Sequence, residues 1–251
     1  MAEESKESRS QARLAAAAER KALAEAAAKK ARRSRVLVSL AVISPILLVV
    51  IVGVSISLVK SKVDSTVAAP SVASKVDGYG LVFNDTAKPQ IDVWEDFQCP
   101  ACKTFEDANG AQVRELAQNG KARVVYHALS FLGAESVILA NASACSADEG
   151  KFLDFHDYLF KNQKPENSGY WGLSRLTAAG VAVGLNQSTF EACVKSGKYA
   201  KWVENIAADG AKSNVNQTPT VLINGKEIDR NAGAYIDTAL FKKALADAGV
   251  K

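Results

Sequence analysis

The C-terminal two-thirds of this 251-residue sequence predicts a mixed α/β domain, and three features of the pattern carry this prediction. Between residues 81 and 126, segments rich in β-branched and aromatic residues alternate with a helical segment. A block at about 134–212 then repeats apolar residues every three to four positions, as helices do. A strand–turn–strand segment and a last helix follow. This order indicates a mixed sheet flanked by helices, with the helical block inserted as a subdomain.

Each element can be placed from its local pattern. Helices are expected at 103–118, where Gly120 ends the segment, and at 236–248. The expected strands are 81–84, 91–97, 122–126, 220–223 and 226–228. The last two strands are joined by Asn224-Gly225, a pair that favours the two-residue turn of a β-hairpin.

The charge of the chain is concentrated at one end. Residues 1–35 carry ten Lys and Arg against five Asp and Glu, whereas residues 60–251 carry 21 against 22. The sequence pI of about 8.8 therefore reflects a basic, Ala-rich tail and not a basic folded surface. This distribution argues against a nucleic-acid-binding function.

Val36 to Val59 is an uncharged run long enough to cross the roughly 30 Å hydrocarbon core of a membrane as one helix. Five basic residues between 29 and 35 precede it, so the tail 1–35 is expected in the cytoplasm and the domain at 78–251 outside. Residues 60–77 would be a linker. We therefore expect a single-pass protein of the cell membrane with an extracytoplasmic domain. A cleaved signal peptide is the alternative, although the apolar run of such peptides is shorter.

The cysteines carry the candidate chemistry. Cys99 and Cys102 form a Cys-Pro-Ala-Cys motif between the strand at 91–97 and the next helix. The positive end of the helix and its free backbone N–H groups stabilise a thiolate, so a lowered pKa is expected for Cys99. Such a thiolate is present at neutral pH and is a good leaving group in disulfide exchange. Cys102, one turn further on, is placed to resolve a mixed disulfide.

Other uses of the cysteines stay open at this point. A CxxC pair can be half of a zinc site, but no metal site is expected, because Cys145, Cys193, His127 and His156 are all isolated. A hydrogen-bonding or surface role is expected for the two histidines. An inert disulfide at 99–102 is a further alternative. With 99–102 as the redox pair, Cys145 and Cys193 are expected to form a structural disulfide in an extracytoplasmic domain, and two free buried thiols are the alternative.

Three segments together resemble a known family. They are the strand–FQCPAC–helix segment, the helical insertion, and Thr218-Pro219-Thr220 leading into VLINGKEI. In this combination the sequence resembles the DsbA-like branch of the thioredoxin superfamily, and more narrowly the membrane-anchored or secreted DsbA-like proteins of actinobacteria. The resemblance covers about residues 78–250. It implies a thioredoxin-like fold with an inserted helical subdomain.

The resemblance also implies roles for residues around the dithiol. Pro219 would be a cis-proline facing the cysteines, and the backbone of Thr218 would pair with an extended substrate. Phe97 and Gln98 would flank the substrate-binding surface, with a core role for Phe97 as the alternative. Ala101 replaces a histidine of the best-known oxidase, which indicates a milder oxidising potential.

One position near the dithiol departs from the thioredoxin pattern. Val93 stands six residues before Cys99, where thioredoxins carry an acid that assists proton transfer to the buried thiol. Glu95 and Asp96 are the nearest carboxylates. Either of them takes this role, or both are solvent-facing residues at the end of a strand.

The function implied by the resemblance is oxidation of cysteines in secreted or membrane proteins by exchange with a Cys99–Cys102 disulfide. The two cysteines carry the electrons, so no cofactor is expected. A membrane protein resembling vitamin K epoxide reductase would reoxidise the pair. The alternatives are a thiol reductase or disulfide isomerase of the same fold, a non-redox client-binding or chaperone module, and a recruiter acting through residues 1–35.

Overall fold

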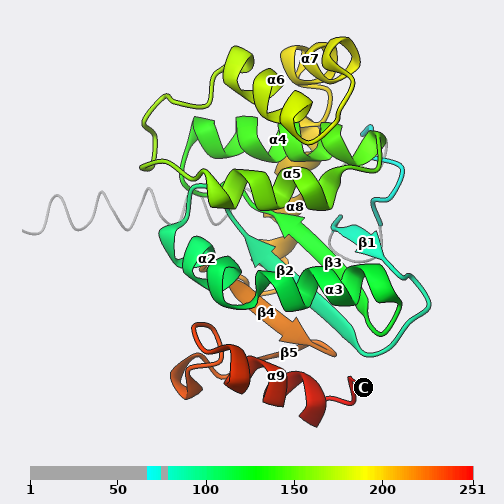
Figure 1. Ribbon diagram of the computed structural model, residues 1–251. Coiled ribbons are helices and arrows are strands. Elements are labelled where there is room, and N and C mark those ends of the chain that lie inside the picture. The colour runs from blue at the N-terminus through cyan, green and yellow to red at the C-terminus, as the bar shows by residue number, and fades with distance from the viewer. Residues whose placement is uncertain (1–66, 75–78, 251) are drawn as a thin grey trace, which may run out of the picture. The chain divides into compact units, whose positions relative to one another are not determined.

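The computed structural model describes residues 67–74 and 79–250, in which a sheet carries helices on both of its faces (Figure 1). The predicted tail at 1–35, the predicted membrane helix at 36–59 and most of the predicted linker at 60–77 lie outside the described residues. Those expectations therefore stay predictions. Within 67–74 and 79–250, no helix is both long and apolar enough to span a membrane.

The sheet has the strand order β1–β3–β2–β4–β5. Its strands are β1 (Leu81–Phe83), β2 (Gln90–Glu95), β3 (Arg123–Ala128), β4 (Thr220–Ile223) and β5 (Lys226–Glu227). β2 and β3 run parallel, and the other neighbours are antiparallel. Val93 of β2 pairs with Tyr126 on one side and with Val221 on the other. This central position of β2 delivers the cysteine motif to the middle of one end of the sheet.

The connection from β2 to β3 is a helical segment with a break in its regularity. It consists of α2 (Pro100–Phe105), a π-helical turn η1 (Glu106–Gly110) and α3 (Ala111–Asn119). One uninterrupted helix at 103–118 was expected, so the helix begins earlier than predicted and contains an additional turn type. Gly120 ends α3 with a φ of 76°, a conformation that glycine adopts without strain.

The insertion is helical over the predicted range of 134–212. Its helices are α4 (Ala134–Asp148), α5 (Phe152–Lys161), α6 (Leu173–Ala182), α7 (Gln187–Ser196) and α8 (Ala200–Lys212). Helices α4 to α7 stack at one end of the sheet, and α8 returns along the face of the sheet opposite α3 (Figure 1). Gly210 of α8 lies so close to Trp94 of β2 that an added Cβ would be 3.1 Å from the indole ring.

The C-terminal hairpin and helix complete the sheet and the helical layer on the face opposite α8. After β5, the 3₁₀ turn η2 (Arg230–Ala232) leads into α9 (Thr238–Asp247). The ring of Phe241 in α9 lies 5.6 Å from that of Phe105 in α2, edge to face. Both rings are fully buried, so this contact anchors the helix that carries the cysteine motif.

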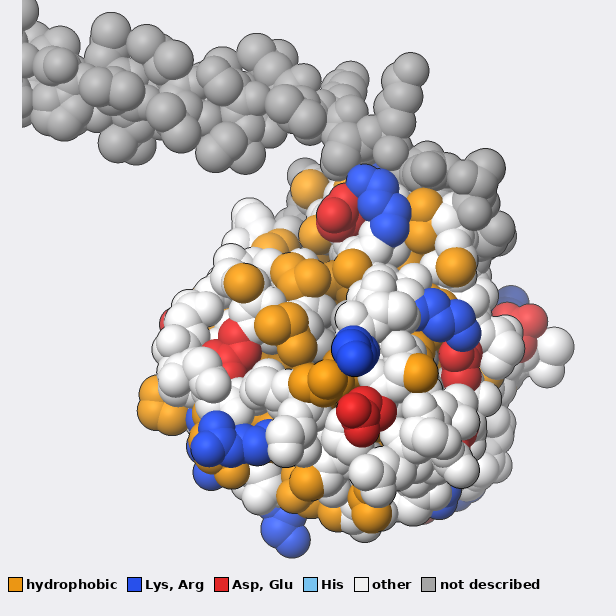
Figure 2. All heavy atoms as spheres, turned by 90° about the horizontal axis from the view of Figure 1, so that it is seen from above, with side chains coloured by type: hydrophobic (Ala, Val, Ile, Leu, Met, Phe, Trp, Pro, Cys, Tyr) orange, Lys and Arg blue, Asp and Glu red, His pale blue; other side chains and the backbone are white. Residues whose placement is uncertain are grey.

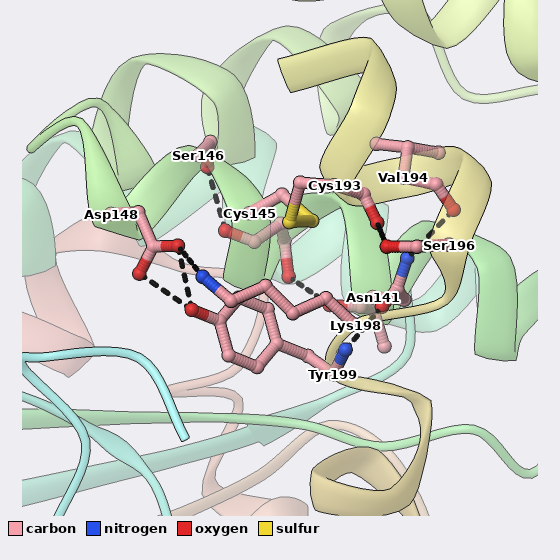
Figure 3. Close-up of a disulfide and its surroundings, with 11 residues drawn as sticks. Asn141, Cys145, Ser146, Asp148, Cys193, Val194, Ser196, Lys198 and Tyr199 are labelled. Carbon is pink, nitrogen blue, oxygen red and sulfur yellow. Dashed lines mark hydrogen bonds and ion pairs between the residues drawn. A yellow bond between two sulfur atoms is a disulfide. The ribbon is translucent and has the colours of Figure 1, made fainter. Parts of the chain in front are cut away.

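A disulfide joins Cys145 of α4 to Cys193 of α7, as predicted, and the alternative of two free thiols is wrong (Figure 3). Closing a chain segment of 48 residues stabilises the fold by about 4 kcal/mol in the chain-entropy model. Beside the bridge, the hydroxyl of Tyr199 donates to the carboxylate of Asp148 at 2.6 Å, and Lys198 pairs with the same carboxylate at 2.7 Å (Figure 3). The start of α8 is thus tied to the end of α4.

The outer end of the molecule, seen from above, carries hydrophobic side chains interspersed with single charges of both signs (Figure 2). Val181 of α6 is among the exposed hydrophobic residues of the insertion.

Candidate active site

The end of β2 and the start of α2 position the two thiols differently. The backbone N–H of Cys99 donates to the carbonyl of Asp96 at 2.9 Å, which makes a tight turn, and Pro100 is then the first helical residue. Cys99 is 8% exposed and Cys102 is 0% exposed. Of the two sulfurs, that of Cys99 is therefore the one near the surface, and the attacking and resolving roles of Cys99 and Cys102 stay predictions.

The pKa values of the two thiols are shifted in opposite directions. The pKa of Cys99 is lowered to about 6, chiefly because its thiolate accepts a hydrogen bond from the Cys102 thiol. The Thr218 side chain and the backbone N–H groups of Cys102 and Ala101 act in the same direction, whereas burial opposes them. Burial raises the pKa of Cys102 well above its ordinary value, and the hydrogen bond to Cys99 and the charge of Glu95 raise it further. At neutral pH, Cys99 is therefore mostly thiolate while Cys102 keeps its proton.

Thr218 and Pro219 are brought against the dithiol from the far end of the insertion. The sulfur of Cys99 lies 3.6 Å from the carbonyl oxygen of Thr218. The Thr218–Pro219 peptide bond is cis, as predicted. Pairing of the Thr218 backbone with a substrate stays a prediction.

Phe97 and Gln98 do not flank a surface, and this prediction is corrected. Phe97 is 2% exposed, and its ring lies 5.1 Å from that of Phe160 in α5, so the alternative of a core role is the correct one. Gln98 is 3% exposed. Its side-chain Nε2 donates to Ser136 Oγ at 2.7 Å, and its side-chain Oε1 accepts a hydrogen bond from the backbone N–H of Asn167 at 2.6 Å. Both side chains hold the cysteine motif against the helical insertion.

Asp96 and Glu95 are buried, so the alternative of solvent-facing strand ends is wrong. The Asp96 carboxylate accepts hydrogen bonds from the N–H of Gln98 at 2.9 Å and from the hydroxyl of Ser136 at 2.7 Å. Burial raises the pKa of Asp96 more than these hydrogen bonds lower it. The negative charge of Glu95 contributes to the raised pKa of Cys102.

Glu95 belongs to a buried cluster that sequence reasoning missed. Nε2 of His156 in α5 lies 2.5 Å from Oε1 of Glu95, and Glu106 of η1 joins them. Burial lowers the pKa of His156, but the negative charges of Glu95 and Glu106 outweigh it and raise that pKa well above its ordinary value. Burial, and then the charge of Glu95, raise the pKa of Glu106.

The three side chains of this cluster are of the types that ligate metal ions. Donor atoms of Glu95, Glu106 and His156 lie within 4.8 Å of one another, a spacing that a divalent cation can bridge. However, the contact of 2.5 Å between Glu95 and His156 is that of a strong hydrogen bond, which occupies both donor atoms. No local signal in the sequence connects the two residues, because they are 61 positions apart and meet only through the insertion.

Comparison with known proteins decides the family. The family model described as Thioredoxin matches residues 81–240, which run from β1 through the cysteine motif and the insertion into α9. The chain belongs to the thioredoxin family.

Similar proteins narrow this assignment. Disulfide bond formation protein D of Bacillus subtilis (strain 168) is 26% identical over 165 residues, which cover 64% of this chain and 74% of that protein. The structure of the reduced form of the disulfide bond oxidoreductase DsbG from Mycobacterium tuberculosis matches with a TM-score of 0.54 and 29% identity. The match covers 75% of this chain and 86% of the DsbG chain. MdbA, a thiol-disulfide oxidoreductase from Actinomyces oris, shares the fold with a TM-score of 0.62 and 22% identity. The match covers 75% of this chain and 94% of the MdbA chain. The predicted resemblance to DsbA-like disulfide oxidoreductases is confirmed, and with it the expected enzyme class of thiol–disulfide exchange.

Proposed function

We propose that this protein is an extracytoplasmic oxidant that introduces disulfide bonds into secreted or membrane proteins. The observation that carries the proposal is that the pKa of the Cys99 thiol is lowered whereas that of the Cys102 thiol is raised. Because the pKa of Cys99 is lowered to about 6, the dithiol form gains a stabilised thiolate that the disulfide form does not have. A stabilised reduced form makes the Cys99–Cys102 disulfide a good oxidant.

The reaction proceeds in two exchanges. A substrate thiolate attacks the Cys99 sulfur of the disulfide, the Cys99–Cys102 bond breaks, and Cys102 leaves and takes up a proton. A second substrate thiolate then attacks the substrate sulfur of the mixed disulfide and displaces Cys99 as a thiolate. The substrate loses two electrons and the enzyme gains them, so the exchange requires no cofactor. Because Cys99 is the more acidic thiol, it is the better leaving group in the second step.

A groove next to Cys99 supports the binding of an extended substrate. It has a volume of about 620 Å³ and begins at Thr218, whose carbonyl oxygen lies 3.6 Å from the Cys99 sulfur. Phe131, which is 45% exposed, lines it together with Leu132. A second groove, lined by Ile228 and Leu240, includes none of the residues around the dithiol. The first groove therefore fits a peptide whose cysteine faces Cys99 and whose neighbouring side chain is apolar.

The site of action follows from the sequence in this proposal. The apolar run at 36–59 would anchor the domain near newly secreted chains, and the basic residues before it support a location of the domain outside the cytoplasm. A membrane partner resembling vitamin K epoxide reductase would accept the two electrons and restore the disulfide. The Cys145–Cys193 disulfide supports this location, since structural disulfides persist in oxidising compartments.

The proposal is tested with the oxidised full-length protein and a reduced, unfolded protein that contains two cysteines. One disulfide per enzyme disulfide is expected to form in the substrate within a single turnover. Cys99→Ser should abolish the reaction, because it removes the sulfur that the substrate attacks. Cys102→Ser should accumulate a mixed disulfide when its Cys99 is loaded with a small disulfide and mixed with substrate.

Two outcomes would contradict the proposed direction. A protein that is isolated as the dithiol and reduces disulfides faster than it forms them would be a reductase. Full protection of an unfolded client by the Cys99→Ser variant would indicate a binding module in which the dithiol is incidental.

A further inference from the structure

The cluster of Glu95, Glu106 and His156 lies beside Cys102, because the backbone N–H of Glu106 donates to the carbonyl oxygen of Cys102 one helical turn earlier. It contains buried groups that the two exchanges do not use. Glu95, Glu106 and His156 bring their donor atoms within 4.8 Å of one another. One carboxylate oxygen of Glu95 and one of Glu106 are buried without a hydrogen-bond partner among the residues that the structure describes. An unpaired buried polar atom is destabilising, so two of them beside a reacting thiol indicate a functional constraint.

The hydrogen bonds of His156 lead from this cluster to the surface. Its Nε2 contacts Oε1 of Glu95 at 2.5 Å, and its Nδ1 contacts Oδ1 of Asp157 at 3.1 Å. Glu95 is 1% exposed, whereas the side chain of Asp157 is 46% exposed. An imidazole ring can hold or release a proton at either nitrogen. A row of protonatable atoms therefore connects the end of β2 with solvent beside α5.

Thiol–disulfide exchange requires such a connection. Cys102 holds no proton in the disulfide and one proton in the dithiol, so each turnover delivers or removes a proton at its sulfur. The side chain of Cys102 has no exposed area in the described structure. The proton must therefore arrive through protein groups or through a local opening of the fold.

We propose that Glu95, His156 and Asp157 form the route by which protons pass between Cys102 and solvent. Glu95 exchanges the proton with the sulfur, and His156 is a positioning residue that acts through Glu95. The inference rests on the proposed function only in requiring exchange at Cys99 and Cys102, in either direction.

Each reduction of the Cys99–Cys102 disulfide moves one proton along this route. When Cys102 leaves as a thiolate, it takes one proton from the carboxyl pair of Glu95 and Glu106. His156 restores that proton at Glu95 from its Nε2 while its Nδ1, which carries no proton at that moment, takes one from water beside Asp157, so the neutral ring changes tautomer. One proton thus moves from solvent to the Cys102 sulfur, and the electrons move only in the exchange itself. Reoxidation runs the same transfers in reverse.

Titratable and charged groups from several elements face this route. Besides Glu95 and His156, they are Cys102 of α2, Glu106 of η1, Arg114 of α3, Tyr126 of β3, and Asp154 and Asp157 of α5. Arg114 pairs with Asp157 at 2.8 Å and also with Asp154, which fixes the position of the outer end of the route. Burial raises the pKa of Tyr126 well above its ordinary value, so its hydroxyl keeps its proton and does not exchange protons with the route.

The test follows the step in which Cys102 must lose its proton. The reduced full-length protein is mixed with oxidised glutathione between pH 5 and 9. Acid quenching and mass spectrometry then separate the formation of the Cys99–glutathione mixed disulfide from its resolution by Cys102. In His156→Gln and Asp157→Asn, resolution at pH 7 is expected to slow by at least about tenfold with an altered pH profile, while attack by Cys99 keeps its rate.

His127→Gln is the matched control. His127 is 1% exposed like His156, and its Nε2 contacts a carboxylate oxygen of Asp92 at 3.2 Å. It stacks on Trp94, on the sheet face covered by α8, and belongs to no part of the route. Resolution in this variant is expected to match the unsubstituted protein, so a general effect of removing a buried histidine is separated from a loss of the route.

The outcomes distinguish this inference from the proposed function. Resolution rates of Asp157→Asn and His156→Gln within about twofold of the unsubstituted protein, with an unchanged pH profile, would overturn the route. Because Asp157 is half exposed, its variant decides the question if His156→Gln does not fold. If Cys99 of the unsubstituted protein did not attack glutathione disulfide at all, the proposed function would fail instead.

Discussion

At the scale of single residues, the chemistry depends on the contrast between Cys99 and Cys102. The two thiols are three positions apart, yet the pKa of one is lowered to about 6 and that of the other is raised. The start of a helix is visible in the sequence and predicted the direction of the Cys99 shift, but the largest cause of the lowered pKa is the hydrogen bond from the Cys102 thiol. The raised pKa of Cys102 could not be predicted, because it depends on the burial of the thiol and of Glu95 by elements far along the chain.

The lowered pKa of Cys99 makes a prediction for its reactivity. The rate of alkylation of the reduced protein by iodoacetamide should follow a single titration with a midpoint at a pH of about 6. In Cys102→Ala the midpoint should move upward, because the largest cause of the shift, the hydrogen bond from the Cys102 thiol, is lost. A midpoint near the ordinary value of 9.0 in the unsubstituted protein, or no shift in Cys102→Ala, would contradict this account.

The same shift has a consequence for stability. The folded pKa of Cys99 lies below the ordinary value of 9.0, so the thiolate stabilises the reduced fold fully above pH 9.0. This stabilisation is lost as the pH falls through about 6. The free energy of unfolding of the reduced form should thus rise relative to that of the disulfide form between pH 6 and 8.

At the scale of elements, the π-helical turn η1 (Glu106–Gly110) shapes the buried cluster. The turn brings Glu106 toward Glu95 and His156. Gly110 permits this arrangement, because a Cβ at position 110 would overlap the Glu106 carboxylate. Turns of this type are frequent at functional sites. The sequence did not reveal the turn, since the residues EDANG fit an ordinary helix as well.

Substitution of Gly110 tests this role of η1. Gly110→Ala should lower the free energy of unfolding by about 1–3 kcal/mol, because the new methyl group displaces the Glu106 carboxylate. Gly172→Ala is the matched control, since a Cβ there meets no atom within 4 Å. Its effect should stay within about 0.5 kcal/mol in the same urea titration. Equal effects of the two substitutions would contradict the close packing of Glu106 against Gly110.

Elements with strong local signals were predicted well. The hairpin turn at Asn224-Gly225, the helix end at Gly120 and the insertion at 134–212 all follow from backbone preferences or from periodicity. Phe97 and Gln98 were placed wrongly because they are buried by the insertion and not by the sheet. No local pattern in β2 indicates that contact.

At the scale of the whole molecule, the active site is assembled from distant parts of the chain. Thr218 and Pro219 reach Cys99 across 119 positions, and only the family resemblance pointed to this meeting. The amide of Gln163, beyond α5, donates to the carbonyls of Phe97 and Cys99 at 2.9 and 3.0 Å. The insertion therefore supports the cysteine motif directly, and it also supplies His156 to the cluster below.

The direction of the exchange is also a property of the whole molecule, because it depends on the relative stability of the dithiol and disulfide forms. The equilibrium reduction potential of the full-length protein, titrated against glutathione and read by alkylation of Cys99, measures this balance directly. The account predicts a value between about −120 and −180 mV, where the disulfide is readily given to a substrate. A value near about −270 mV, similar to that of thioredoxin, would contradict the proposed oxidising function and indicate a reductase.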